Sequence, residues 1–185
     1  MGKTIFYFKK ILICSLLFLS SCGVFKSAIT VVSTDNTTPG TSTVLYASKL
    51  SLSDYDSCAI VSGALQCWGY NAYGQLGDGT TVSKSSPVTV ISSGVTSVAL
   101  GYNHSCAIVS GALQCWGYNY YGQLGDGTTV SKSSPVTVIG SGVTSVALGY
   151  DHSCAIVSGA LQCWGYNNYG QLGDGTTVSK SSPVT

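Results

Sequence analysis

The stretch HSCAIVSGALQCWGYNYYGQLGDGTTVSKSSPVT, residues 104–137, returns as residues 152–185 with one difference, Asn168 in place of Tyr120. A slightly less exact copy lies 48 positions before the first of these two. Self-similarity at a fixed period of about 50 residues is typical of stacked repeat units, of which propeller blades are a common kind. The repeat therefore predicts an architecture of near-identical modules, each packed against the next.

Each period contains four candidate strands separated by glycine-bearing turns. In one period these strands are residues 88–91, 95–100, 105–109 and 112–117. Ser93-Gly94 separates the first two strands and Ser110-Gly111 the last two, and a glycine there can adopt the positive φ of a tight hairpin. Four strands make one blade, so the expected fold class is all-β, with β-propeller blades of four antiparallel strands.

A two-residue turn at Ser110-Gly111 would set the register of its flanking strands. Cys106 then faces Cys115 in a non-hydrogen-bonded pair, where opposed Cα atoms are about 4.5 Å apart, which is short but feasible for a disulfide. Each such bridge would contribute roughly 2.7 kcal/mol on the chain-entropy model. The expected disulfides are Cys58 with Cys67, Cys106 with Cys115, and Cys154 with Cys163.

A metal site is the competing interpretation of the same residues. His104, Cys106 and Cys115 could act as ligands, but their spacing is not that of a zinc finger, and Asp56 replaces the His in the first repeat. Thiols in an exported protein pair with one another instead. We therefore expect disulfides, and neither a metal nor another cofactor.

The beginning of the chain has the features of an export signal. Lysines precede an apolar run at residues 11–19, which is too short to span a bilayer and is followed by small residues. The end of this segment, Leu19-Ser20-Ser21-Cys22, resembles the lipobox of bacterial lipoproteins, which implies cleavage before Cys22 and acylation of that residue. An ordinary secretory peptide followed by a chance Cys is the alternative.

These features predict three parts of the chain. The parts are a lipoprotein signal peptide at residues 1–21, a lipidated N terminus and flexible linker at residues 22–42, and the repeats at residues 43–185. The predicted location is a bacterial membrane, with the repeats facing the periplasm or the cell exterior. Acyl chains on Cys22 would hold the protein there, because two anchoring signals already suffice for stable attachment.

Charge and composition argue against two classes of function. Only 8% of the residues are charged, there is no Arg, and the formal net charge is +1, so no basic stripe can neutralise phosphates. Nucleic-acid binding is therefore not expected. No acid/base pair or activated nucleophile can be nominated, because His104 and His152 repeat one position and Glu is absent. We expect the two histidines to be structural, with hydrogen bonds inside a blade.

The glycine-rich segment at residues 74–81 has two tempting interpretations. It lacks the Lys-Ser/Thr of a phosphate loop and no helix signal follows it, so a turn between blades is expected instead. Asp78, Asp126 and Asp174 could bind calcium, but one carboxylate per repeat falls short of the roughly six to eight oxygen ligands that this ion takes. Asp-Gly is an ordinary turn pair.

The run Cys-Trp-Gly-Tyr-Asn-x-Tyr-Gly-Gln-Leu-Gly-Asp-Gly-Thr begins at Cys67, Cys115 and Cys163. It resembles the repeats of the regulator-of-chromosome-condensation (RCC1) family, in the cysteine-bearing form of exported bacterial proteins. The resemblance covers residues 47–185 and implies a β-propeller, usually of seven blades. Nuclear nucleotide-exchange and chromatin roles do not follow from it here, because they depend on a nuclear setting and an entire ring.

The chain is too short for such a ring, since its strands sum to about three blades. Residues 47–52 align with residues 95–100, so the first repeat is expected to begin at its second strand, and residues 182–185 to begin another first strand. A partial propeller leaves unpaired strand edges. We expect either a truncated reading frame or a self-associating chain whose copies complete one another's ring.

Tyrosines follow the last strand of each repeat, together with Asn, Ser and Gly, a mixture that supplies rigid contact area and adaptable hydrogen bonds. The predicted binding loops contain Tyr70, Ala72, Tyr73, Tyr118, Tyr120, Tyr121, Tyr166, Asn168 and Tyr169. Ala72, Tyr120 and Asn168 occupy one repeat position, and this tolerance indicates exposure. Packing of the tyrosines between blades is the alternative.

The leading functional hypothesis is a membrane-tethered, non-catalytic propeller module that binds an extracytoplasmic protein or glycan. Inhibition of an enzyme is a second hypothesis, because secreted propellers of the resembled family include inhibitors of β-lactamases; no motif here names a target. A structural or adhesive surface protein without a specific ligand is the third.

Overall fold

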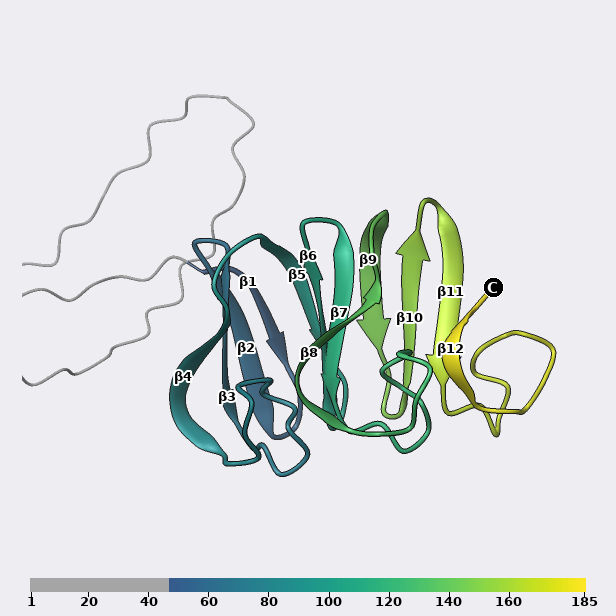
Figure 1. Cartoon of the computed structure of the whole chain (residues 1–185), viewed down its shortest axis with the longest axis horizontal. Coiled ribbons are helices and arrows are strands. Elements are labelled where there is room, and N and C mark those ends of the chain that lie inside the picture. Colours follow the sequence, from purple (N-terminus) through teal and green to yellow (C-terminus); the bar gives the residue numbers. More distant parts are fainter. Residues whose placement is uncertain (1–46) are drawn as a thin grey trace, which may run out of the picture.

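The computed structural model describes residues 47–185, which form twelve β-strands in three four-stranded antiparallel sheets (Figure 1). The first sheet contains β1 (Ala47–Leu52), β2 (Asp56–Val61), β3 (Ala64–Gly69) and β4 (Lys84–Ile91). The second contains β5 (Val95–Leu100), β6 (His104–Val109), β7 (Ala112–Gly117) and β8 (Lys132–Ile139). The third contains β9 (Val143–Leu148), β10 (His152–Val157), β11 (Ala160–Gly165) and β12 (Lys180–Val184).

The three sheets stand side by side along the long axis, each with one face toward the next (Figure 1). This confirms the predicted all-β class and the four-stranded antiparallel blades. Within residues 47–185 no helix is long and apolar enough to cross a membrane. The predicted signal peptide, Cys22 and the linker at residues 22–42 lie outside the described residues.

The central hairpin of each sheet has the predicted two-residue turn. Ser110 and Gly111 both have positive φ, at 50° and 83°, as a type I′ turn requires. Val109 therefore pairs with Ala112, and Cys106 with Cys115. The other two hairpins have the same register.

Disulfides join all three predicted cysteine pairs, with a Cα separation of 4.1 Å in each. The metal interpretation of His104, Cys106 and Cys115 is wrong because both sulfurs are bonded to each other. Among residues 47–185 no group of three potential ligands stands close enough to hold a metal ion.

The predicted grouping of strands into blades needs a correction. The strand at residues 84–91 pairs with β3 of its own sheet, Cys67 opposite Val88, and not with β5. Ser93-Gly94 is thus a connection between sheets, and the chain begins each sheet with the strand that was expected to be second. A glycine suits this position both in a hairpin turn and in a connection between sheets, because Gly94 has a positive φ of 78°. Its carbonyl accepts a hydrogen bond from Ser110 N of the next sheet at 2.9 Å.

Two other expectations change with it. The last strand, Lys180–Val184, completes the third sheet instead of starting a new blade. The glycine-rich segment at residues 74–81 connects β3 to β4 within one sheet, and it packs on the following sheet. The described residues therefore contain three whole blades. The alignment of repeats had suggested an incomplete blade at each end of the repeat region instead.

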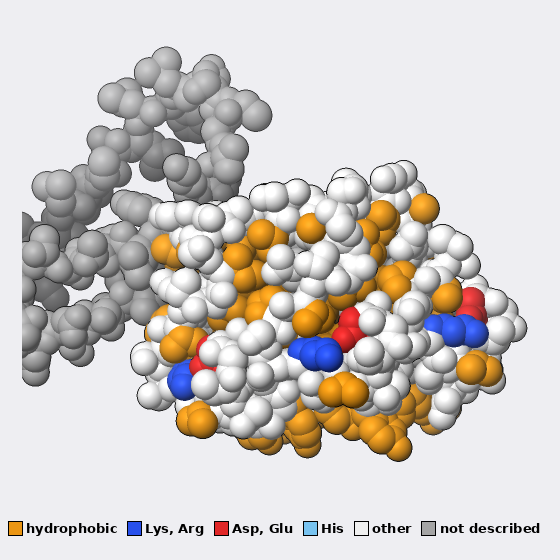
Figure 2. Space-filling view, viewed as in Figure 1, with side chains coloured by type: hydrophobic (Ala, Val, Ile, Leu, Met, Phe, Trp, Pro, Cys, Tyr) orange, Lys and Arg blue, Asp and Glu red, His pale blue; other side chains and the backbone are white. Residues whose placement is uncertain are grey.

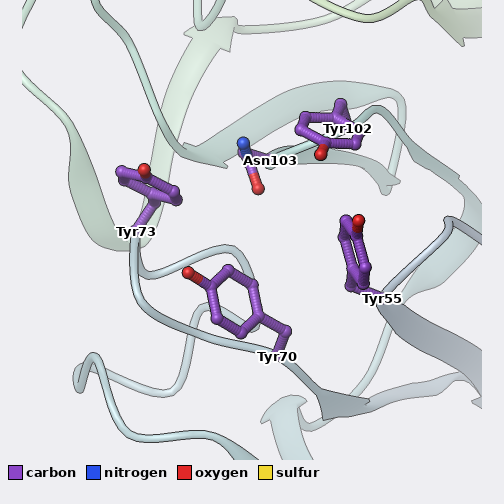
Figure 3. A pocket seen from close by; sticks show the side chains of 5 residues that line it. All are labelled: Tyr55, Tyr70, Tyr73, Tyr102 and Asn103. Atoms are coloured by element: carbon purple, nitrogen blue, oxygen red, sulfur yellow. The ribbon is translucent and has the colours of Figure 1, made fainter.

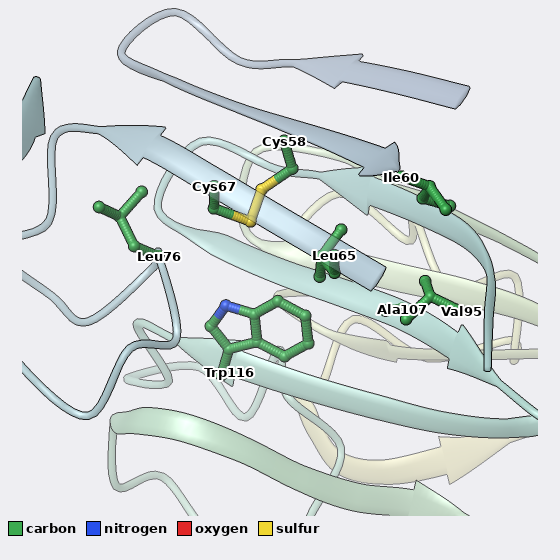
Figure 4. Packing of buried hydrophobic residues seen from close by; sticks show 8 residues of the cluster. All are labelled: Cys58, Ile60, Leu65, Cys67, Leu76, Val95, Ala107 and Trp116. Atoms are coloured by element: carbon green, nitrogen blue, oxygen red, sulfur yellow. A yellow bond between two sulfur atoms is a disulfide. The ribbon is translucent and has the colours of Figure 1, made fainter. Parts of the chain in front are cut away.

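The core lies between sheets and not within one. Residues of the first sheet and its β3–β4 loop pack against Val95, Ala107 and Trp116 of the second (Figure 4). The loop carbonyl of Gln75 accepts the Trp116 indole N–H at 2.8 Å. Gly77 makes room for this ring, because a Cβ there would come within 2.6 Å of the indole nitrogen. The second and third sheets repeat this packing around Trp164.

Candidate functional site

Two sets of connections meet at one end of the three sheets. Short turns join the first strand of each sheet to the second, and 14-residue loops such as residues 70–83 join the third strand to the fourth. Antiparallel pairing places both at the same end, the lower end in Figure 1. Orange side chains gather along this lower edge in Figure 2. This end carries the residues predicted to bind.

A buried asparagine holds each long loop in shape. The Asn71 amide donates to the carbonyls of Thr80 and Val82 at 3.1 and 3.2 Å, and its Oδ1 accepts from Leu76 N at 2.9 Å. Asn119 and Asn167 make the same contacts in the other two loops. A buried amide with its donors and acceptor satisfied rigidifies its surroundings, so the loops are preorganised platforms.

The Asp-Gly pair of each loop is part of the same frame. Asp78 Oδ1 accepts from Thr80 N at 3.0 Å, and its Oδ2 lies 3.2 Å from Lys84 Nζ. Asp126 and Asp174 have the corresponding threonine and lysine partners. These carboxylates are therefore engaged by the turn, as predicted for Asp-Gly. The pairs stand out as three blue and red contacts in Figure 2.

All ten tyrosines of residues 47–185 form a connected set on this end, which we call the tyrosine belt. Its members are Tyr55, Tyr70, Tyr73, Tyr102, Tyr118, Tyr120, Tyr121, Tyr150, Tyr166 and Tyr169. Two contacts cross sheet boundaries between long loops: Tyr73 and Tyr118 have ring centroids 5.0 Å apart, and Tyr121 and Tyr166 4.8 Å. Neighbouring loops are thereby locked to one another.

Exposure differs among the belt residues. The variable position is exposed in all three loops, as its tolerance predicted, at Ala72, Tyr120 and Asn168. Tyr169 is the most exposed residue of the tyrosine belt, at 88%. Tyr118, Tyr121 and Tyr166 are half-buried and touch across sheets. Display and packing between blades, the two interpretations of the sequence, therefore each describe part of the belt.

A pocket of about 350 Å³ opens between the first two sheets. It is lined by Tyr55, Tyr70, Tyr73, Tyr102 and Asn103, and we call it the four-tyrosine pocket (Figure 3). Tyr55 and Tyr102 come from the short turns and were not among the predicted binding residues. They occupy different repeat positions: Tyr55 aligns with Asn103 and recurs nowhere, whereas Tyr102 recurs once, as Tyr150, and aligns with Asp54 in the first repeat.

A second hollow adjoins the first and shares Tyr102 with it. It is lined also by Asp54, Tyr150 and backbone at Gly101 and Gly149. A hydrogen bond to the Tyr102 side chain raises the pKa of Tyr55, and the nearby Asp54 carboxylate adds to that rise. The phenol of Tyr55 therefore stays neutral at physiological pH. Neither hollow is lined by a lysine.

Comparison with known proteins agrees with this architecture. Residues 62–108, 110–156 and 158–185 match the model of the regulator of chromosome condensation (RCC1) repeat, and a second RCC1 repeat model matches residues 95–123 and 143–171. The chain belongs to the RCC1 repeat family. No curated protein matches it.

Solved structures similar to this RCC1-repeat chain include human WBSCR16, with TM-score 0.65 and 24% identity over 76% of the chain. Prp20p from Saccharomyces cerevisiae, which binds Gsp1p and histones, has TM-score 0.64 and 21% identity over 79% of the chain. At these identities the likeness concerns the fold. The chain spans 39% of the length of WBSCR16 and 40% of that of Prp20p.

In this RCC1-repeat chain one histidine bridges two blades. His104 Nε2 lies 2.9 Å from Ser153 Oγ of the third sheet, which corrects the expectation of a hydrogen bond inside one blade. Ser153 gives its only proton to the Gln123 carbonyl at 2.7 Å, so His104 Nε2 must carry the proton and donate. Burial lowers the pKa of His104 to about 3. A neutral, buried imidazole whose serine is equally buried is a structural group without access to a substrate.

The first repeat replaces this bridge with a local contact. Asp56 stands at the histidine position and bonds to the Ser53 hydroxyl in its own turn. Ser53 occupies the repeat position that holds Gly101 in the second repeat. A Cβ at Gly101 would come within 2.5 Å of the His104 ring. Burial raises the pKa of Asp56 to about 6. The two differences from the second repeat, Ser53 for glycine and Asp56 for histidine, are therefore sterically linked.

Proposed function

We propose that this RCC1-repeat chain is a non-catalytic recognition module that binds an extracytoplasmic protein or glycan through the tyrosine belt, while Cys22 tethers it to a bacterial membrane. The observation that carries the proposal is the gathering of ten tyrosines on one end of the sheets, seven of them on the long loops held by Asn71, Asn119 and Asn167 and three on the short turns. Tyrosine supplies large contact area at a low cost in side-chain entropy, and rigid loops lower the cost further.

Two further observations support recognition over catalysis. His104, one of the two histidines of the described residues, is buried and bonded to Ser153 between blades. The most exposed side chains of the belt, Tyr120 and Tyr169, lie on separate long loops, so a partner that contacts both would span two sheets. Binding of other proteins by Prp20p, an RCC1 relative, is compatible with this role.

The tether is supported by the lipobox-like sequence before Cys22 and by the three disulfides, which require an oxidising compartment to persist. Intact mass of the protein extracted from the native host membrane tests both. We expect residues 22–185 plus acyl chains, with a gain of six hydrogens on reduction of the three bridges. A Cys22→Ser variant that stays membrane-bound would contradict the anchor.

Binding is tested by probing the full-length protein against a glycan array and a cross-linked envelope fraction of its host. We expect Tyr120→Ser combined with Tyr169→Ser to abolish the captured signal without a change in Tm. The matched control is Val130→Ser combined with Val178→Ser, because these valines lie on the same loops at 61% exposure and belong to no belt contact. Equal loss of signal in the valine control, or no loss in the tyrosine variant, would contradict the proposed surface.

A further inference from the structure

The aromatic rings that line the four-tyrosine pocket are inclined to one another and do not form one flat surface. The ring planes of Tyr55 and Tyr70 are inclined by 59°, those of Tyr55 and Tyr102 by 70°, and those of Tyr70 and Tyr73 by 70°. Figure 3 shows the four rings standing around the hollow in different orientations. A flat group such as a sugar ring stacks on one broad face, whereas inclined rings present several faces to a compact, rounded group.

The size of the pocket also favours a small head group. Its volume of about 350 Å³ lies at the lower end of the roughly 300–1,000 Å³ typical of ligand pockets. The one non-aromatic side chain of the lining is Asn103, and its Oδ1 already accepts a hydrogen bond from Gln75 Nε2 at 3.3 Å. Its remaining polar groups are the Asn103 amide nitrogen and the four phenol hydroxyls, of which those of Tyr55 and Tyr102 bond to each other, so most of the lining is aromatic ring.

The charges around the pocket favour a cation. Asp54 is exposed and lines the hollow that shares Tyr102 with the pocket. Lys84, Lys132 and Lys180 are each paired with an aspartate of a long loop, and no lysine lines either hollow. The electron-rich faces of neutral tyrosines attract cations, and rings grouped as a cage recognise quaternary ammonium groups.

From this geometry we propose that the four-tyrosine pocket binds a methylated ammonium head group, with the cation held against Tyr55, Tyr70, Tyr73 and Tyr102, next to the hollow that Asp54 lines. The inference rests on the proposed recognition function and names the chemistry that one part of the belt recognises. No covalent step is involved. Choline, phosphocholine and trimethyl-lysine carry this head group.

The test uses the full-length protein with its tyrosines isotopically labelled, titrated with choline at constant ionic strength. We expect saturable shifts of the Tyr55, Tyr70, Tyr73 and Tyr102 ring signals. The decisive comparison ligand is 3,3-dimethylbutan-1-ol, which has the shape of choline without its charge. Because a partly desolvated cation–π contact contributes about 1 to 2 kcal/mol, choline should bind roughly tenfold more tightly. Equal affinities for the two ligands, or no saturable shift with choline, would overturn the proposal.

Variants of Tyr55 distinguish binding of the cation by the aromatic face from a contribution of side-chain bulk alone. Tyr55→Phe keeps the ring and should retain choline binding, whereas Tyr55→Leu should weaken it about tenfold, as expected for loss of a cation–π partner. Tyr169→Leu is the matched control, because Tyr169 is exposed and lies outside the pocket. A Tyr55→Leu variant with unchanged choline affinity would overturn the assignment of this ring.

The same titrations identify the source of the head group and keep the two proposals separate. Choline, phosphocholine and trimethyl-lysine differ only beyond the ammonium group, so the tightest of the three shows which substituent fits the pocket rim. If choline fails to bind but Tyr120 and Tyr169 variants lose the partner, the cation pocket is wrong and the recognition surface stands. If choline binds and the tyrosine variants keep the partner, the proposed surface is wrong and the pocket stands.

Discussion

Trp116 Nε1 donates a hydrogen bond to the backbone carbonyl of Gln75, 2.8 Å away, across the boundary between the first and second sheets. The same carbonyl accepts the Ser105 hydroxyl at 2.8 Å. Trp164 and Ser153 repeat the arrangement on the Gln123 carbonyl at the next boundary. At each of the two boundaries one loop carbonyl thus joins neighbouring sheets, and each indole fills the space left by a glycine.

We expect Trp116→Ala to lower the free energy of unfolding by about 3–5 kcal/mol, the usual cost of deleting a fully buried aromatic ring. Trp68→Ala should cost clearly less, because Trp68 occupies the same repeat position but is only half-buried. Urea unfolding of both variants measures the difference. Equal costs would show that Trp68 is as well covered in solution as Trp116.

The link between positions 53 and 56 predicts a non-additive pair of substitutions. Asp56→His alone should destabilise the protein, because the Ser53 Cβ occupies the place that Gly101 leaves free beside His104. Combined with Ser53→Gly, the new imidazole can donate to Ser105 Oγ as His104 does to Ser153. A double-mutant cycle in urea should give a favourable coupling of about 1 kcal/mol or more, within the range for contacting residues. Additive effects would contradict the steric link.

Stability should fall as the pH is lowered through the window set by His104. Its pKa is about 3 in the folded protein because of burial, against 6.5 for an ordinary imidazole. Between these pH values His104 is protonated in the unfolded chain but neutral in the folded protein. The free energy of unfolding therefore decreases as the pH falls, by up to about 1.4 kcal/mol per pH unit.

The His104→Gln variant isolates this effect because glutamine stays neutral. Asp56 acts in the opposite direction, since its folded pKa of about 6 lets the folded protein bind a proton first as the pH falls, but this contribution is common to both proteins. Urea unfolding from pH 7 to pH 4 should therefore show a steeper acid loss in the parent than in the variant. Parallel curves would mean that His104 is protonated in the fold.

Three leucines at one repeat position differ in burial, and their substitution should therefore differ in its cost to stability. Leu65 and Leu113 are fully buried, whereas Leu161, on the outer face of the third sheet, is 61% exposed. Leu113→Ala should cost about 2–5 kcal/mol and Leu161→Ala much less. A large cost at Leu161 in this chain would show that another blade or a second copy covers that face in solution, and sedimentation across a concentration series would separate the two.

How much of the site was predictable differs between its parts. The long-loop tyrosines and the exposed variable position were found because they recur at a fixed repeat position. Tyr55 was missed because no tyrosine recurs at its repeat position, and Tyr102 because its position holds a tyrosine in only two of the three copies. Only the packing of the first sheet on the second brings the two residues to one pocket. The asparagines that brace the loops repeat as regularly as the tyrosines, but a side chain that bonds mainly to the backbone of its own loop carries no distinctive sequence signal.

By itself the sequence determined the repeat, the strands, the hairpin register and the three cysteine pairs, because each depends on residues a few positions apart joined by a turn of known geometry. The tertiary structure decided which sheet the strand at residues 84–91 joins, where His104 donates its proton, and which leucines are covered. These features depend on the neighbour across a sheet boundary. Near-identical repeats cannot specify that neighbour locally, since the same residues face different surroundings in each copy.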